Sequence, residues 1–269
     1  MIYVRNILLL GIGLIVLTGC GNYRVKVVKK KEPPKNQRQP VAKVKKVDLK
    51  KSSMFNARLC AAYIRKKSYQ VAMYKCNKAL KHDPKNAVAH KWKAVLHQQL
   101  GQPELARKYY QAAIRLAPDD AGARNNFGAF LCQQKQYRQS EKQFLRAASN
   151  PLYGSRAFAY VNAGVCMQSA GDRDKAEKYF RLALSLDRNN AHALIRLAAL
   201  QLDAGKVESA YRLMQRWSAS NRQNSESLWL NIRIARLRGD VNRASSLGLL
   251  LVNKYPESTE AKRYRRRNN

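Results

Sequence analysis

The chain has 269 residues, 45% of them hydrophobic and 26% charged, which is enough to form one extended repeat array with a continuous core. Lysine and arginine number 52 against 17 aspartates and glutamates, so the formal net charge is +35. That excess excludes a preference for basic partners and predicts attraction to an anionic one: a membrane surface, an acidic protein or nucleic acid.

The first twenty residues have the layout of an export signal. Arg5 supplies a positive charge, and the apolar stretch over residues 7–17 is too short to span a membrane as a mature helix. The ending Leu17-Thr18-Gly19-Cys20 resembles the bacterial lipobox, in which the chain is cleaved before the cysteine and the thiol is acylated. The resemblance implies a lipid anchor at Cys20, and Gly21 after it implies the periplasmic face of the outer membrane. The alternative is an ordinary signal peptide with an incidental cysteine.

A basic segment follows the signal. Residues 21–51 hold twelve lysines or arginines, two acids and three prolines, with no apolar stripe of helical or strand period. Because such a segment buries little apolar surface, we expect a disordered tether. It is able to lie along anionic lipid headgroups beside the anchor, or to act only as a solvated spacer.

From residue 54 onward the sequence predicts helices with turn signals at a fixed interval. Pro84 and Pro118 are 34 residues apart, and so are Gly171, Gly205 and Gly239. This period, with small residues where two helices cross, is typical of a tetratricopeptide repeat (TPR).

One complete hairpin can be followed in residues 157–205. Gly164, Ala176 and Ala183 are small enough for two helices to cross closely, and Phe180 fills the gap toward the next unit. We therefore expect an all-α TPR superhelix of about six repeats whose first helices line a concave groove. The predicted segments are a removed signal peptide, a lipidated tether, the repeat domain and a basic tail that caps it, over residues 1–19, 20–52, 53–258 and 259–269.

Four segments are more specific than generic TPR positions. They are residues 125–132 (NNFGAFLC), 144–153 (FLRAASNPLY), 162–166 (NAGVC) and 227–236 (SLWLNIRIAR). They resemble the PilF/PilW family of type IV pilus biogenesis lipoproteins. The resemblance implies an outer-membrane pilotin that helps the pilus secretin reach the outer membrane and multimerise there. The long basic tether and the high positive charge depart from the usual family pattern.

Two classes of function remain open. The first is the pilotin, with the secretin as protein partner, and the second is a general periplasmic TPR adaptor that tethers another envelope complex. The export signal disfavours a third class, nucleic-acid binding.

The TPR pattern also predicts which side chains face the groove. They are Asn125, Asn126, Ala129, Gln133, Phe158, Val161, Asn162, Val165, His192, Ile195, Arg196, Leu202, Trp229 and Arg233. Four of them, Asn125, Asn162, His192 and Arg196, resemble part of the clamp with which some TPR proteins hold a chain-terminal carboxylate. Since Ala129 replaces an asparagine of that clamp, we favour a mixed apolar and polar peptide groove. The asparagines could instead satisfy backbone groups between repeats.

Four cysteines remain besides Cys20, in a compartment where thiols tend to pair. Cys60 and Cys76 lie symmetrically about the turn of one hairpin, and Cys132 and Cys166 lie on the first helices of consecutive repeats. Each pair is either a disulfide or two buried thiols, because a bridge needs α carbons within about 7 Å and suitably directed side chains.

The sequence motifs do not indicate an enzyme. The sequence holds no glycine-rich phosphate loop, nucleophile elbow or polar cluster of paired carboxylates. Its four histidines are His82, His90, His97 and His192. The pair on a common helical face, His90 and His97, lies two turns apart, whereas zinc ligands on a helix prefer one turn. We therefore expect no enzyme, no metal and no cofactor.

Overall fold

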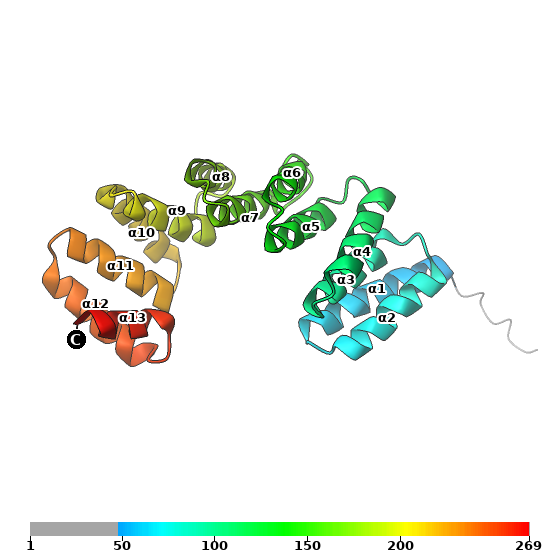
Figure 1. Cartoon of the computed structure of the whole chain (residues 1–269), viewed down its shortest axis with the longest axis horizontal. Helices are drawn as coiled ribbons and strands as arrows, with labels where there is room; N and C mark the ends of the chain where they lie inside the picture. The colour runs from blue at the N-terminus through cyan, green and yellow to red at the C-terminus, as the bar shows by residue number, and fades with distance from the viewer. Residues whose placement is uncertain (1–47, 269) are drawn as a thin grey trace, which may run out of the picture. The chain divides into compact units, whose positions relative to one another are not determined.

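The computed structural model describes residues 48–268, with side chains to residue 266, so the predicted signal peptide, Cys20 and the tether up to residue 47 lie outside the described residues. The described part of the chain consists of thirteen α-helices without a strand (Figure 1). The first helices of six hairpins are α1 (Leu49–Arg65), α3 (Ala87–Gln99), α5 (Ala121–Gln133), α7 (Arg156–Ser169), α9 (Ala191–Asp203) and α11 (Ser225–Leu237). The second helices are α2 (Tyr69–His82), α4 (Pro103–Leu116), α6 (Tyr137–Ala148), α8 (Arg173–Leu186), α10 (Val207–Ser220) and α12 (Val241–Lys254), and α13 (Thr259–Asn268) follows them. None of these helices is long and apolar enough to cross a membrane.

Local sequence determines where the first helices begin. In five of the six hairpins the residue before the first helix is an aspartate or asparagine whose side chain accepts a hydrogen bond from the backbone N–H three residues on. The exception is α7, which begins after Ser155 without a side-chain cap. It follows a connection over residues 149–155, which is longer than the four-residue connections that precede α3, α5, α9 and α11.

The turn inside each hairpin requires a left-handed residue. Gly101, Gly171, Gly205 and Gly239 take φ values of 69° to 84°, which glycine adopts without a steric penalty. The first and third hairpins place lysines at this point instead, Lys67 and Lys135, with φ of 58° and 57°. The recurring turn explains why the predicted repeat period is correct even where glycine is missing.

One buried contact recurs between the two helices of a hairpin. A Cβ added to Gly164 on α7 would lie 2.6 Å from Phe180 Cε1 on α8, and one added to Gly128 would lie 2.8 Å from the ring of Phe144. The equivalent places in the first hairpin are Cys60 and Cys76, and in the fifth hairpin they are the buried residues Ala198 and Met214. The volumes of the two side chains that meet at this contact, one from each helix, therefore compensate each other, as close packing requires.

The hairpins stack into two layers. Each first helix packs beside the first helix of the next repeat, whereas no described second helix comes as close to the next second helix. The second helices are therefore splayed farther apart, so the stack bends toward the first helices, which form the inner layer of the superhelix (Figure 1). The inner layer is the face on which the sequence predicts a partner groove.

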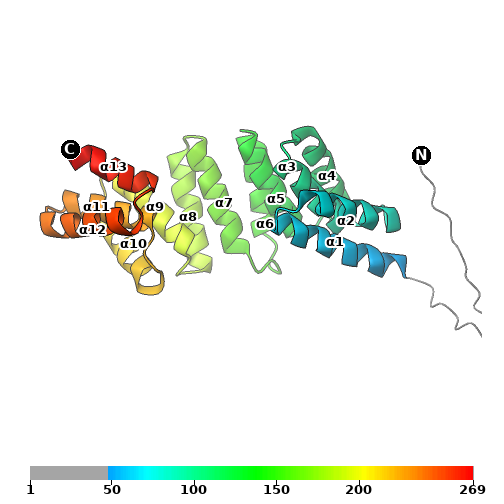
Figure 2. The same ribbon diagram turned by 90° about the horizontal axis from the view of Figure 1, so that it is seen from below.

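Both ends of the repeat domain differ from the predicted boundaries. Helix α1 begins at Leu49, so the last residues of the predicted disordered tether are helical, because Asp48 Oδ1 accepts a 3.1 Å hydrogen bond from the backbone N–H of Lys51 and caps the helix. At the other end α13 packs against α11 and α12 (Figure 2). Its Ala261 is fully buried and its Tyr264 ring lies against Gly248 of α12. Helix α13 is thus part of the folded array, which it caps.

Candidate partner groove

The structure brings the centre of the predicted groove together between α5 and α7. Gln133, Asn162 and Val165, together with Ala129, line one hollow of about 290 Å³. The other residues lining it are Cys132, Phe144, Cys166 and Ser169. Most of this lining is apolar, and Gln133 and Asn162 contribute amides to it. A hollow of this kind suits an apolar side chain of a bound segment, with amides to hold the segment's backbone.

Three residues of the predicted groove are not accessible, and for them the prediction was wrong. Val161 is 4% exposed, Ile195 5% and Leu202 3%. They belong to the hydrophobic core cluster that also includes Leu230 and Ile234. Neighbouring first helices lie close enough to cover these positions, so the side chains pack between repeats and do not face a partner.

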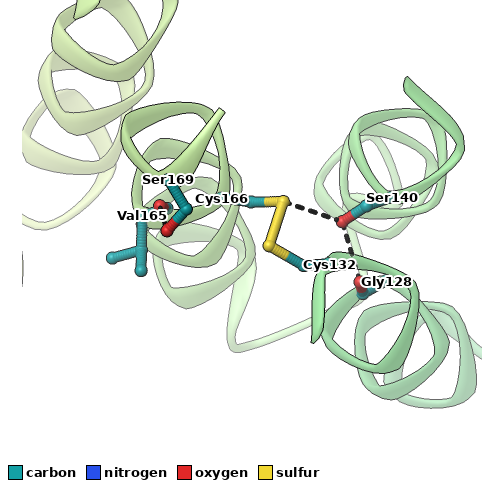
Figure 3. Close-up of a disulfide and its surroundings, with 6 residues drawn as sticks. All are labelled: Gly128, Cys132, Ser140, Val165, Cys166 and Ser169. Carbon is teal, nitrogen blue, oxygen red and sulfur yellow. Dashed lines mark hydrogen bonds between the residues drawn. A yellow bond between two sulfur atoms is a disulfide. The ribbon is translucent and has the colours of Figure 1, made fainter. Parts of the chain in front are cut away.

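The lining of the hollow includes a disulfide between consecutive repeats, which Figure 3 shows. Cys132 of α5 and Cys166 of α7 are joined, with their α carbons 5.8 Å apart. Ser140 Oγ lies 3.3 Å from Cys166 Sγ and donates a 2.7 Å hydrogen bond to the Gly128 carbonyl oxygen. On the chain-entropy model a bridge over a sequence separation of 34 stabilises the fold by roughly 4 kcal/mol. It also fixes the distance between the two helices that line the hollow.

The other disulfide, Cys60 to Cys76, joins α1 to α2 within the first hairpin, with α carbons 5.3 Å apart. It occupies the place of the glycine and phenylalanine pairs of the third and fourth hairpins. Both cysteines are fully buried, so this bridge belongs to the core and not to the groove.

Four lining residues of the hollow were missed as groove residues: Cys132, Phe144, Cys166 and Ser169. Helical spacing carries the signal for two of them. Ser169 lies one turn after Val165, and its hydroxyl donates a 3.0 Å hydrogen bond to the Val165 carbonyl oxygen. Cys132 lies three residues after Ala129 on the same helix face.

Two predicted groove asparagines form a direct link between repeats. Asn162 Nδ2 on α7 donates a 3.0 Å hydrogen bond to Asn125 Oδ1 on α5. The Asn162 side-chain oxygen has no hydrogen-bond partner in the part of the chain that the structure describes. It is therefore available to accept a hydrogen bond from the backbone of a bound segment.

The four residues that resemble a carboxylate clamp already make contacts within the chain, beginning with the hydrogen bond between Asn162 and Asn125. Arg196 Nη1 lies 3.4 Å from Glu226 Oε1, so its charge is already paired. The His192 ring meets the Phe158 ring edge-on, with centroids 5.6 Å apart. Arg233, farther along the groove, donates a 2.6 Å hydrogen bond to Asp203. None of Arg196, His192 and Arg233 lines the hollow between α5 and α7, and the mixed apolar and polar groove stays a prediction.

The remaining predicted groove residues, Asn126 and Trp229, are partly exposed on α5 and α11. Trp229 packs against the core cluster of the last hairpin and so lies away from the hollow. Within the described residues no group of three or more His, Cys, Asp or Glu side chains could hold a metal ion.

A stack of helical hairpins with an inner groove defines a tetratricopeptide repeat protein, and the tetratricopeptide repeat family model matches residues 63–121 and 168–233. The type IV pilus assembly protein PilF of Pseudomonas aeruginosa is 32% identical over 198 residues, which cover 74% of this chain and 79% of that protein. The chain therefore belongs to the PilF/PilW family of TPR proteins.

Solved structures agree with this family. The P. aeruginosa PilF structure superposes with a TM-score of 0.73 at 29% identity, covering 81% of this chain and 99% of that one. The structure of PilW, described as a widely conserved type IV pilus biogenesis factor, gives a TM-score of 0.70 at 28% identity, covering 78% and 96%. At these identities the similarity extends beyond the generic TPR fold.

Proposed function

We propose that this protein is a lipid-anchored TPR protein of the periplasmic face of the outer membrane that acts as a pilotin, helping the type IV pilus secretin to assemble. The observation that carries the proposal is the similarity to the type IV pilus assembly protein PilF along 79% of that protein's length. The similarity to PilW, named as a type IV pilus biogenesis factor, supports the same process. The lipobox-like ending at Cys20 supports the anchor.

The groove gives the proposal a binding surface. Its hollow is lined mostly by apolar residues, and the Cys132–Cys166 bridge holds the two flanking helices at a fixed distance. A preformed site of this type binds a peptide segment with little loss of conformational entropy on the protein side. We place a segment of the secretin, or of a protein bound to it, in this hollow.

Deleting the protein from its host is expected to reduce SDS-resistant secretin multimers and surface pili together, because a secretin without its pilotin assembles poorly. Immunoblotting of unheated membranes and counting of surface pili measure the two effects. Expression of the wild-type chain from a plasmid is the control and restores both. Normal multimers in the deletion strain would overturn the pilotin role. Recovery of peptidoglycan enzymes on an affinity-tagged copy expressed in that strain would then favour the envelope adaptor.

Replacing Cys20 with alanine is expected to release the protein from the outer membrane without changing its fold. The acyl chains would supply the stable membrane affinity, and position 20 precedes the first described helix by 29 residues. Membrane fractionation, followed by a thermal melt of the soluble variant, checks both statements. A variant that still sediments entirely with the outer membrane after a high-salt wash would contradict the anchor.

A further inference from the structure

The outer layer carries one cation per repeat in four consecutive repeats. We call this set the cation row, and its members are Lys108 on α4, Lys142 on α6, Lys178 on α8 and Arg212 on α10. Each lies seven residues after the left-handed turn residue of its hairpin, namely 101, 135, 171 and 205, so all four share one register position. All four side chains are exposed. Because the register is the same, they project from equivalent points of four successive second helices.

The charge of the row is not neutralised by its neighbours. None of the four cations has an ion pair or hydrogen bond among the residues that the structure describes. Glu104 and Asp174 lie one turn before Lys108 and Lys178 but form no ion pair with them in the described part of the chain. The carboxylate beside Lys142 is engaged elsewhere, because Glu141 lies 3.1 Å from Lys175 Nζ and accepts a hydrogen bond from the Tyr179 hydroxyl. Burial and then the contact with Glu141 raise the pKa of Tyr179, so its hydroxyl remains a donor. Glu208 likewise accepts a 2.8 Å hydrogen bond from Arg238.

Further cations strengthen the row at its centre. Arg138, Lys142 and Arg146 lie four residues apart along the outer side of α6, and all three are exposed. With Glu141, Leu145 and Ser149 they line a shallow hollow of about 520 Å³, in which three cations face one carboxylate. Like charges at this spacing destabilise a helix, so the arrangement gives no advantage to folding. The outer face of α6 is therefore suited to an anionic partner.

We propose that the cation row docks the repeat array on an anionic lipid surface. The proposal rests on the proposed function, because the Cys20 anchor is what places the array beside a bilayer. Packed helices lie about 10 Å apart, and the second helices are splayed farther apart than that, so the partner must present negative charge over more than about 30 Å. An anionic bilayer does so without having to fold, and each Lys or Arg near it raises the affinity by roughly fivefold.

Docking through the outer layer leaves the partner groove free. The row lies on second helices, whereas the hollow is lined by first helices and Phe144. The anchored protein can then lie against the membrane and still hold a segment of another protein on its inner layer.

The test uses the chain from residue 20 with Cys20→Ser, so that no acyl chain carries the binding. The row variant combines Lys108→Gln, Lys142→Gln, Lys178→Gln and Arg212→Gln. The matched control removes four exposed cations from the ends of helices and from turns, with Arg65→Gln, Lys66→Gln, Lys206→Gln and Arg222→Gln. Both variants have the same net charge and keep the basic tether. Affinity is measured by co-sedimentation with vesicles of phosphatidylethanolamine and phosphatidylglycerol, and with neutral phosphatidylcholine vesicles.

We expect the row variant to lose about tenfold or more in affinity for the anionic vesicles and the control variant less than about threefold, with weak binding of every chain to neutral vesicles. Equal losses in both variants would overturn the proposal, because net charge alone would then account for binding. Unchanged binding of the row variant would also overturn it and leave the tether as the lipid contact. The assay contains neither secretin nor pili, so its outcome is independent of the pilotin test.

Discussion

Truncating Phe180 to alanine is expected to lower the free energy of unfolding by about 3–5 kcal/mol. The ring is fully buried on α8, and it lies directly against Gly164 of α7. It belongs to the largest cluster of buried residues, which extends from Phe144 in the third hairpin to Ile234 in the sixth. Because each repeat relies on its neighbour for its core, the loss will spread beyond the fourth hairpin. Urea denaturation followed by far-UV circular dichroism measures it.

A matched variant and a compensating pair make this prediction specific. Phe158→Ala removes the same side chain from α7, where it is 44% exposed, and is expected to change stability much less. Gly164→Ala alone overpacks the contact and is expected to cost about 1–3 kcal/mol. Adding Phe180→Met should recover part of that cost, because the pair then copies Ala198 and Met214 of the next hairpin. Strict additivity in the double variant would contradict the contact.

The hairpin turns show why the repeat was predictable from the sequence. Every hairpin needs a residue with left-handed backbone conformation at one place. Glycine supplies it in four of the six hairpins, so the repeat period is visible directly in the amino-acid sequence. The cysteines 60 and 76 lie symmetrically about such a turn, so the sequence brought them together and left two alternatives, a disulfide or two buried thiols; the structure joins them. Local geometry of this kind depends on few residues.

Features that depend on neighbouring helices were harder to predict. Burial of Val161, Ile195 and Leu202 follows from the distance between adjacent first helices, which no single repeat encodes. The start of α1 was hidden in a strongly basic segment, although Asp48 is a recognisable cap. The packing of α13 had one signal, since Gly248 in the middle of α12 leaves room for the Tyr264 ring. Glycine within a helix often marks such a close approach.

If the proposed pilotin role acts through the hollow, converting Val165 to arginine is expected to abolish secretin binding while the fold remains intact. Val165 is 36% exposed and lines the hollow together with Cys132 and Cys166. A guanidinium there fills the space meant for an apolar side chain and brings a charge that a bound segment would have to desolvate. Since the side chain already reaches solvent, the free protein can place the arginine without burying it. The loss should therefore appear in binding and not in stability.

The control is Val241→Arg, the same substitution at a valine that is 69% exposed on α12 and does not line the hollow. Both variants are expressed with an affinity tag in the deletion strain, and their thermal melts are compared with that of the wild type. Similar melting temperatures would show that any difference in binding comes from the site that was changed.

Recovery of the secretin on the tagged chain, together with the amount of SDS-resistant multimer, is the most direct test of a secretin-assembly role that acts through this groove. We predict that Val165→Arg recovers less than about a tenth of the wild-type amount of secretin and leaves multimers at the level of the deletion strain, whereas Val241→Arg matches the wild type. Wild-type recovery and normal multimers with Val165→Arg would contradict the groove as the secretin site.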